Sequence, residues 1–201
     1  MNVQAMSNTD LLAVLLGNNR DMAARLAQFG LLRLFEFSSK SEYSGAAEER
    51  VSYVAHPVLA AAKELYVRAL QEELTLGECL SSPEAVKAYL IGRLAHSESE
   101  QFWALWLDAQ NRLIASELLF TGTLTQTAVY TRELVKSALR HNAASLVIAH
   151  NHPSGCSDPS GADIRMTRSL KDALYLVDVR LLDHFIVAGN QAVSFAEKGL
   201  I

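Results

Sequence analysis

Residues 150–163 read His150-Asn-His-Pro-Ser-Gly-Cys-Ser-Asp-Pro-Ser-Gly-Ala-Asp163, and this segment is the most informative about the fold. It overlaps the end of the run Leu146–His150, which is too short for a helix and is typical of a strand buried on both faces. Two prolines and two glycines then interrupt regular structure, and a helical pattern returns over Ser160–Tyr175. We therefore predict a buried strand, a sharp turn and a helix.

Two histidines at the end of the predicted strand indicate a metal site. Because side chains of a strand alternate between faces, His150 and His152 project to the same side if the strand continues through His152. Two neutral imidazoles on one side make half of a zinc site. Asp163, eleven positions further on in the first turn of the predicted helix, can add a carboxylate. Three protein ligands leave a fourth position for water, which is the pattern of catalytic rather than structural zinc.

The same residues also have a purely structural interpretation. Ser160-x-x-Asp163 has the spacing of a capping box with Ser160 as the N-cap, and a carboxylate at a helix N-terminus suits the helix dipole. Spacing alone favours this interpretation for both residues. A single histidine at a strand end is commonly structural. Cys156, within the same turn, is an alternative fourth ligand.

Residues 79–201, which include this segment, alternate between helical and strand patterns. A serine cap and a proline at the first helical position, Ser82-Pro83, start a helix that runs to about Arg93. We predict further strands over 102–107, 113–120 and 180–188, and a further helix over 131–140. The fold class predicted for this part of the chain is α/β.

Residues 1–78 have a different character, because only helical patterns occur in them. Ser7 or Thr9 can cap a helix over Leu11–Leu16, and apolar stripes recur over Met22–Phe29 and Val58–Leu76. We therefore predict two domains, a small all-helical region over 1–78 and the α/β domain over 79–201.

The overall composition excludes several classes of protein. Of the 201 residues, 50% are hydrophobic and 20% are charged, as in ordinary globular chains. The net charge of −4 argues against a generic binder of nucleic acid or membrane surfaces. Two cysteines are too few for a disulfide framework and indicate a reducing compartment. No apolar run is long enough for a membrane span, and the first residues lack a secretory pattern. We expect a soluble cytoplasmic protein.

Five blocks of sequence resemble one known family. The spacing His150-x-His152-x7-Ser160-x2-Asp163 is similar to the JAMM (MPN+) metalloprotease motif. The wider context resembles the bacterial RadC family over about residues 98–201. The blocks are Leu146-Val-Ile-Ala-His-Asn-His-Pro-Ser-Gly155, Pro159-Ser-Gly-Ala-Asp163, Phe120-Thr-Gly-Thr123, Arg132-Glu-Leu134 and Leu182-Asp-His-Phe-Ile186. Spaced blocks are far more specific than one His-x-His pair.

The resemblance implies a fold and a metal site. The fold is an MPN domain of the JAB/JAMM type, with a mixed β-sheet flanked by helices. The implied cofactor is one zinc ion, and the implied ligands are His150, His152 and Asp163. The implied activity is metal-dependent hydrolysis of amide or isopeptide bonds.

Two catalytic roles are also implied by the resemblance. Ser160 occupies the position of the serine that helps to stabilise the oxyanion of the tetrahedral intermediate. The general base is a glutamate just before the first strand of the core, and Glu100 fits that place best. Glu98, two residues earlier on the same face, is the alternative, and spacing alone favours a solvated acidic run for both. His184, within a family block, either is structural or orients a ligand.

The N-terminal region departs from the family pattern. Longer RadC proteins carry a helix-hairpin-helix with glycines, whose backbone amides can approach a phosphate. The corresponding place here reads Val54-Ala-His-Pro57, and Pro57 has no amide hydrogen. Residues 1–78 hold 7 Lys/Arg and 10 Asp/Glu, a net charge of −3. DNA binding by this region is therefore doubtful, and a protein-docking or substrate-presenting role is favoured.

Three functions remain open at this point. The first is a zinc-dependent metallopeptidase or isopeptidase of RadC type that acts on a protein or peptide substrate. The second is a non-catalytic MPN module that serves as a scaffold, with zinc structural or absent. The third is a DNA-associated hydrolase linked to DNA repair. The ligand set with a candidate glutamate disfavours the second, and the acidic charge disfavours the third. The sequence leaves oligomerisation open.

Overall fold

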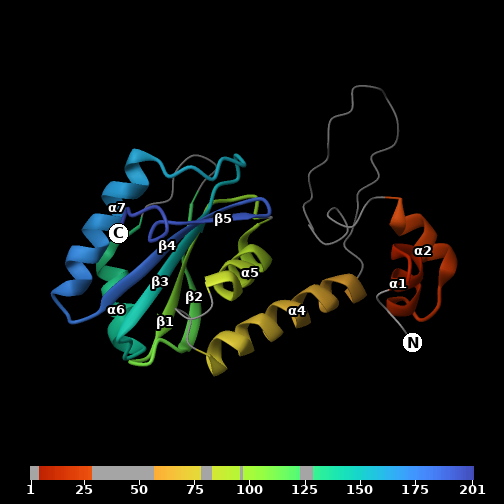
Figure 1. Cartoon of the computed structure of the whole chain (residues 1–201), viewed down its shortest axis with the longest axis horizontal. Helices are drawn as coiled ribbons and strands as arrows, with labels where there is room; N and C mark the ends of the chain where they lie inside the picture. Colours follow the sequence, from red (N-terminus) through yellow and green to blue (C-terminus); the bar gives the residue numbers. More distant parts are fainter. Residues whose placement is uncertain (1–4, 29–56, 78–82, 96, 123–128) are drawn as a thin grey trace. The chain divides into compact units, whose positions relative to one another are not determined.

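A computed structural model describes residues 5–28, 57–77, 83–95, 97–122 and 129–201 (Figure 1). The chain divides into two compact units, Met1–Tyr66 and Val67–Ile201, each of which is described by itself. The position predicted for the glycine hairpin, residues 54–56, and the predicted cap Ser82 lie outside the described residues.

The second unit is built on a five-stranded mixed sheet with the strand order β2-β1-β3-β4-β5. The strands are β1 (Gln101–Leu107), β2 (Leu113–Thr121), β3 (Ser145–Asn151), β4 (Arg180–Ala188) and β5 (Gln191–Ser194). β1 pairs antiparallel with β2 and with β3, β3 and β4 are parallel, and β4 and β5 are antiparallel. The predicted α/β fold with a mixed sheet is confirmed.

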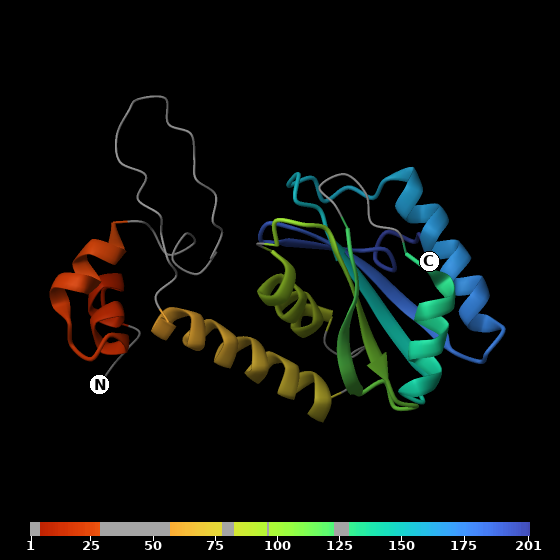
Figure 2. The same ribbon diagram turned by 180° about the vertical axis from the view of Figure 1, so that it is seen from behind.

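Helices cover both faces of this sheet, as Figures 1 and 2 show from opposite sides. They are α5 (Pro83–Leu94), α6 (Thr131–Arg140) and α7 (Gly161–Tyr175). The side chains of β1 alternate between the two faces of the sheet and so contribute to two cores. Leu105 belongs to the core with α5, and Trp106 belongs to the core with α6 and α7. All seven residues of β3 are buried, which explains the apolar run from Leu146 to Ala149 at its centre.

Most of the predicted elements of this unit appear within one residue of their expected bounds. Strand β5 is the exception, because four residues carry too little alternation to be recognised. It forms a tight hairpin with β4, and Gly189 at the turn has a φ of +54°, which favours glycine.

The N-terminal unit contains helices, as expected. They are α1 (Asn8–Leu15), α2 (Arg20–Ala27) and the first part of α4 (Pro57–Leu76), a helix that spans the boundary between the units. The Ser7 hydroxyl caps α1 by accepting the N–H of Asp10, and the Asn19 side chain caps α2. A small core unites buried residues of all three helices: Leu12, Ala13, Ala23, Leu26 and Leu59. Among the described helices, none combines the length and hydropathy that crossing a membrane requires.

Candidate metal centre

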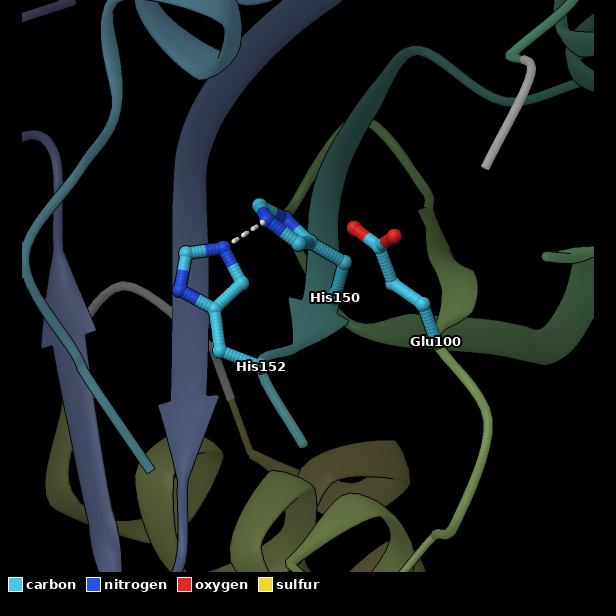
Figure 3. A group of neighbouring side chains, drawn as sticks. All are labelled: Glu100, His150 and His152. Atoms are coloured by element: carbon cyan, nitrogen blue, oxygen red, sulfur yellow. Dashed lines mark hydrogen bonds between the residues drawn. The ribbon is translucent and has the colours of Figure 1, made fainter. Parts of the chain in front are cut away.

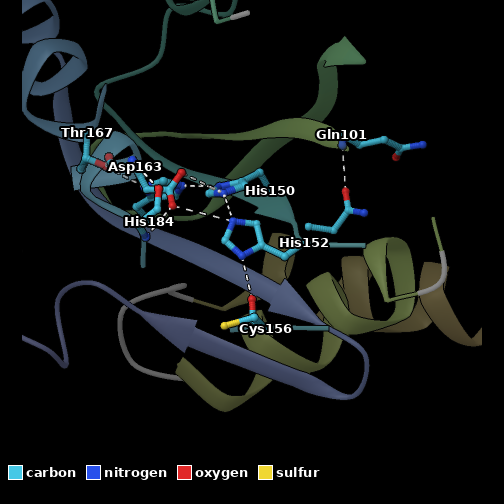
Figure 4. Close-up of polar contacts among 9 residues, drawn as sticks. Gln101, His150, His152, Cys156, Asp163, Thr167 and His184 are labelled. Carbon is cyan, nitrogen blue, oxygen red and sulfur yellow. Dashed lines mark hydrogen bonds and ion pairs between the residues drawn. The ribbon is translucent and has the colours of Figure 1, made fainter. Parts of the chain in front are cut away.

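Strand β3 and helix α7 bring the three predicted metal ligands together (Figure 4). His150 is the penultimate residue of β3, and His152 follows the strand's last residue. The backbone N–H of His152 still donates to the carbonyl of Val187 at 2.8 Å, so the extended pairing with β4 continues past the strand end. The two imidazoles therefore lie on one side of the sheet, as the i, i+2 spacing predicts.

Three side chains converge at this point. The Nε2 atoms of His150 and His152 are 2.9 Å apart. Asp163 places Oδ1 3.3 Å from His150 Nε2 and Oδ2 3.7 Å from His152 Nε2. His150 is buried, and the side chains of His152 and Asp163 are 17% and 11% exposed, so the group is largely shielded from solvent.

Asp163 is held in place by the end of helix α7. Its Oδ2 accepts the backbone N–H of Ser160 at 2.8 Å, and the Ser160 hydroxyl accepts the N–H of Asp163 at 3.2 Å. This reciprocal pair is the predicted capping box, and it coexists with the contacts to the histidines. Burial raises the pKa of the Asp163 carboxyl, whereas the contact with His150 and the hydrogen bonds with Ser160 lower it, and the resulting pKa lies well below its usual range. Asp163 is therefore an anion at neutral pH.

The turn after β3 fixes the orientation of the His152 ring. His152 Nδ1 lies 2.7 Å from the backbone carbonyl oxygen of Cys156. A carbonyl oxygen only accepts, so Nδ1 carries the hydrogen and Nε2 of the neutral ring keeps a lone pair. Cys156 thus contacts the ring through its backbone, while its thiol is free and exposed. Among the described residues, the group of candidate metal ligands does not include this cysteine.

Glu100 lies beside the two histidines (Figure 3). One ligand atom each from Glu100, His150 and His152 lie within 4.8 Å of one another, a candidate metal-binding group. Glu100 is half-buried immediately before β1, whereas Glu98 is exposed and is not a member of this group within the described part of the chain. Asp163 completes the arrangement from the helix side through its two short contacts.

Asn151, which sequence reasoning missed, ties down the segment that carries Glu100. It lies between the two histidines and, by the alternation of the strand, faces the other way. Its Oδ1 accepts the N–H of Gln101 at 2.8 Å, and its Nδ2 donates to the carbonyls of Ser97 at 3.2 Å and Ser99 at 3.1 Å. The one sequence feature that could have indicated this role is an amide side chain, which is both donor and acceptor, at the end of a strand predicted to be buried.

His184 contacts the centre from behind. It lies in β4 with no measurable exposure, and its Nε2 is 2.8 Å from Nδ1 of His150. Phe102 and Phe195 lie against its ring, with centroids 6.3 Å and 4.5 Å away. Burial lowers the pKa of His184 well below its usual value, so this imidazole is neutral.

Comparison with known proteins agrees with this architecture. A profile of the RadC-like JAB domain matches residues 80–200. The chain is 48% identical over 205 residues to a UPF0758 protein of Dechloromonas aromatica, covering 98% of this chain and 90% of that protein. It is 47% identical over 206 residues to a UPF0758 protein of Chromobacterium violaceum, covering 96% and 89%. It is 49% identical over 203 residues to one of Cupriavidus pinatubonensis, covering 97% and 88%.

The profile match, the five-stranded mixed sheet and the His/His/Glu group at the end of its central strand together identify a JAB domain with a candidate metal site. Because the profile covers more than half of the chain and the relatives cover nearly all of it, the chain belongs to the RadC-like JAB domain family, UPF0758. The resemblance and the fold expected from it are confirmed.

Proposed function

We propose that this chain is a zinc-dependent hydrolase that cleaves amide or isopeptide bonds in a protein or peptide substrate. The observation that carries the proposal is the convergence of two imidazole Nε2 atoms and the Asp163 carboxylate, with the Glu100 carboxylate beside them. Membership of the RadC-like JAB domain family supports it.

The donor set fits zinc. His152 presents a bare Nε2, because its Nδ1–H is committed to the Cys156 carbonyl, and Asp163 is an anion. Two imidazole nitrogens and one carboxylate oxygen suit zinc, whereas calcium and magnesium sites consist of oxygen atoms. The proposed ligands are His150, His152 and Asp163, and this number leaves a fourth position open to substrate or water.

Glu100 is the proposed general base rather than a ligand. Asp163 is anchored by the capping box with one oxygen toward each imidazole, which suits a ligand. The ligand atoms of Glu100 and the two histidines lie within 4.8 Å of one another, so the Glu100 carboxylate is close enough to contact a water molecule bound at the open position. The carboxylate would accept a proton from the attacking water and pass it to the leaving amine.

The remaining chemistry is divided between the cofactor and Ser160. When bound, zinc would supply a Lewis acid that lowers the pKa of water toward ~7 and polarises a carbonyl group. The Ser160 hydroxyl oxygen accepts the Asp163 N–H, so its own hydrogen can be donated to the developing oxyanion.

Metal analysis tests the proposal directly. Protein purified without a histidine tag should contain one zinc ion per chain by plasma-emission spectrometry and should hydrolyse members of a fluorogenic peptide or isopeptide library in a chelator-sensitive manner. His152→Ala should lose most of the metal, since one of three protein ligands is removed.

His141→Ala is the matched control for this variant. Its ring also contacts a carboxylate, that of Glu117 at 3.3 Å, but it lies outside the proposed ligand set. This control should keep the wild-type zinc content. Equal zinc in the wild type and in His152→Ala would overturn the proposed site.

A further inference from the structure

A chain of buried polar side chains extends from His150 into the core (Figure 4). His150 Nδ1 lies 2.8 Å from His184 Nε2, and His184 Nδ1 lies 2.7 Å from the hydroxyl oxygen of Thr167. The Thr167 hydroxyl in turn contacts the backbone carbonyl of Asp163 at 2.7 Å. Exposure is at most 2% for His150, His184 and Thr167, so water does not compete for these contacts. The chain begins at one proposed ligand and ends at the backbone of another.

The donors and acceptors in this chain run in one direction. The Asp163 carbonyl oxygen only accepts, so the single hydrogen of the Thr167 hydroxyl is donated to it. The Thr167 oxygen must then accept from His184, which places the His184 hydrogen on Nδ1. His184 is neutral, because a charged imidazole enclosed by aromatic rings would be costly, and its Nε2 therefore accepts.

The last hydrogen bond decides the state of the metal ligand. Because His184 Nε2 accepts, His150 Nδ1 must carry the hydrogen, and Nε2 of His150 keeps its lone pair. That atom is the one that faces His152 and Asp163. The Cys156 carbonyl achieves the same result for His152 from the opposite side. Two independent contacts thus direct two lone pairs to one point.

We propose that Thr167 and His184 are positioning residues that select the Nδ1–H tautomer of His150 and so prepare its Nε2 to bind metal. This inference rests on the proposed zinc site. It adds that hydrogen bonds within the metal-free protein already fix the tautomer of His150 that binds metal. The Thr167 hydroxyl also links helix α7 to strand β4, so the backbone of Asp163 and the ring of His150 are held by one set of contacts.

The first experiment reads the tautomer in metal-free protein. Two-bond ¹⁵N–¹H correlation spectra show which ring nitrogen carries hydrogen, and the His150→Gln protein identifies the His150 signals among the six histidines. We expect His150 in its Nδ1–H form in the wild type. Thr167→Val, which neither donates nor accepts, should shift His150 toward the Nε2–H form, and Thr167→Ser should restore the wild-type spectrum. An Nε2–H form in the wild type would overturn the proposal.

The second experiment measures zinc affinity by competition with a chromophoric chelator. Thr167→Val should weaken zinc binding about 10–100-fold, as loss of a hydrogen-bond partner to a ligand typically does, and Thr167→Ser should bind within about twofold of the wild type. His184→Gln, whose side-chain oxygen can accept from His150, should be weakened less than Thr167→Val. If Thr167→Val fails to fold, His184→Leu takes its place: it offers no acceptor to His150 Nδ1 and should shift His150 toward the Nε2–H form, and an unchanged tautomer in His184→Leu would overturn the proposal.

Ser145→Ala provides the matched control. Ser145 is fully buried at the other end of β3, where its hydroxyl donates to Asn111 at 2.9 Å. Loss of this hydroxyl should leave both the tautomer and the zinc affinity unchanged. Wild-type zinc affinity in Thr167→Val would overturn the positioning role, whereas a wild-type protein that binds no zinc would overturn the proposed function. The spectrum of the metal-free protein separates these two failures.

Discussion

Two polar clusters in the α/β unit each combine a carboxylate with imidazole, and they are built in opposite ways. The Glu117 cluster consists of Glu117, Trp106, Ser137, Arg140 and His141. The Glu117 carboxylate accepts the indole N–H of Trp106 at 3.1 Å, the Ser137 hydroxyl at 2.5 Å and the Arg140 guanidinium at 2.6 Å. His141 Nε2, 3.3 Å away, can donate as well. Donors surround one acceptor, so the protein alone satisfies this cluster.

The metal centre reverses this arrangement. Its N–H groups are turned outward, to the Cys156 carbonyl and to His184, while the Nε2 atoms and the Asp163 oxygen face one another. Converging acceptors are what a cation binds. The direction of the hydrogen bonds, rather than the presence of titratable residues, distinguishes a structural polar cluster from a candidate metal centre.

The largest effect is expected from Glu100, the proposed general base beside the metal centre. Glu100→Gln should retain zinc and fold normally, because glutamine keeps the shape, but should lose about 10²–10⁴-fold in hydrolysis rate, because it cannot accept a proton. The measurement is kcat with a substrate from the library, together with zinc content. Glu98→Gln is the control, since Glu98 is exposed, and it should change little. Equal rates in Glu100→Gln and the wild type would assign the base elsewhere.

A smaller loss of activity is expected when Asn151 no longer holds the segment that carries Glu100. Asn151→Ala leaves the partly buried N–H of Gln101 and the carbonyls of Ser97 and Ser99 without this partner, at a cost of about 1–3 kcal/mol in the free energy of unfolding. Misplacement of the base by about 1 Å can reduce the rate about 10²-fold.

Asn151→Asp gives the matched comparison, because it keeps the acceptor for Gln101 and loses both donated bonds. Its rate should fall between those of the wild type and Asn151→Ala, with zinc content unchanged in all three proteins. A rate for Asn151→Ala equal to that of the wild type would show that Glu100 is positioned without this amide.

The Glu117 cluster should respond to substitution in stability and not in metal content. Burial raises the pKa of Glu117, but the hydrogen bonds from Ser137, Trp106 and Arg140 outweigh it, and the pKa lies below the usual 4.5. A depressed folded-state pKa means that the stabilisation is present above the unfolded value and is lost as the pH falls through the folded value.

Glu117→Gln should therefore reduce the free energy of unfolding by about 1–2 kcal/mol at pH 7, since the group is partly exposed. The difference from the wild type should shrink as the pH falls below about 4.5. Urea denaturation across this pH range measures it. Zinc content at pH 7 should not change, and a loss of zinc would erase the distinction between the two clusters.

Local signals in the sequence account for most of what could be predicted. The apolar run of β3, the turn residues after it and the Ser160-x-x-Asp163 spacing each act within one turn or strand, so periodicity and capping rules reveal them. The shared orientation of His150 and His152 can be predicted as well, because strand alternation alone puts both rings on one side.

Contacts between distant segments could not be predicted in this way. Asn151 meets Gln101 across 50 positions, and His150 meets His184 across 34. Only the pairing of β3 with β1 and β4 brings these residues together, and no rule of spacing encodes that register. Spacing alone therefore does not distinguish Glu100 from Glu98 as the general base. It also does not reveal the Asn151 hydrogen bonds that hold the segment around Glu100.

The smallest effect, none within error, is expected from duplex DNA. Neither cluster adds positive charge that could attract a phosphate, because Arg140 is paired with Glu117 and the metal centre contributes the anion Asp163. The whole chain carries 22 acidic and 18 basic residues, and neutralisation of phosphates supplies most non-specific affinity. Fluorescence anisotropy of a labelled duplex titrated with the full chain at moderate salt should show no micromolar binding.

Micromolar binding with a steep salt dependence would contradict this prediction and would favour a DNA-associated hydrolase. Loss of that binding in Arg140→Ala would further show that the Glu117 cluster releases its cation to a partner, and the contrast between the two clusters would then fail.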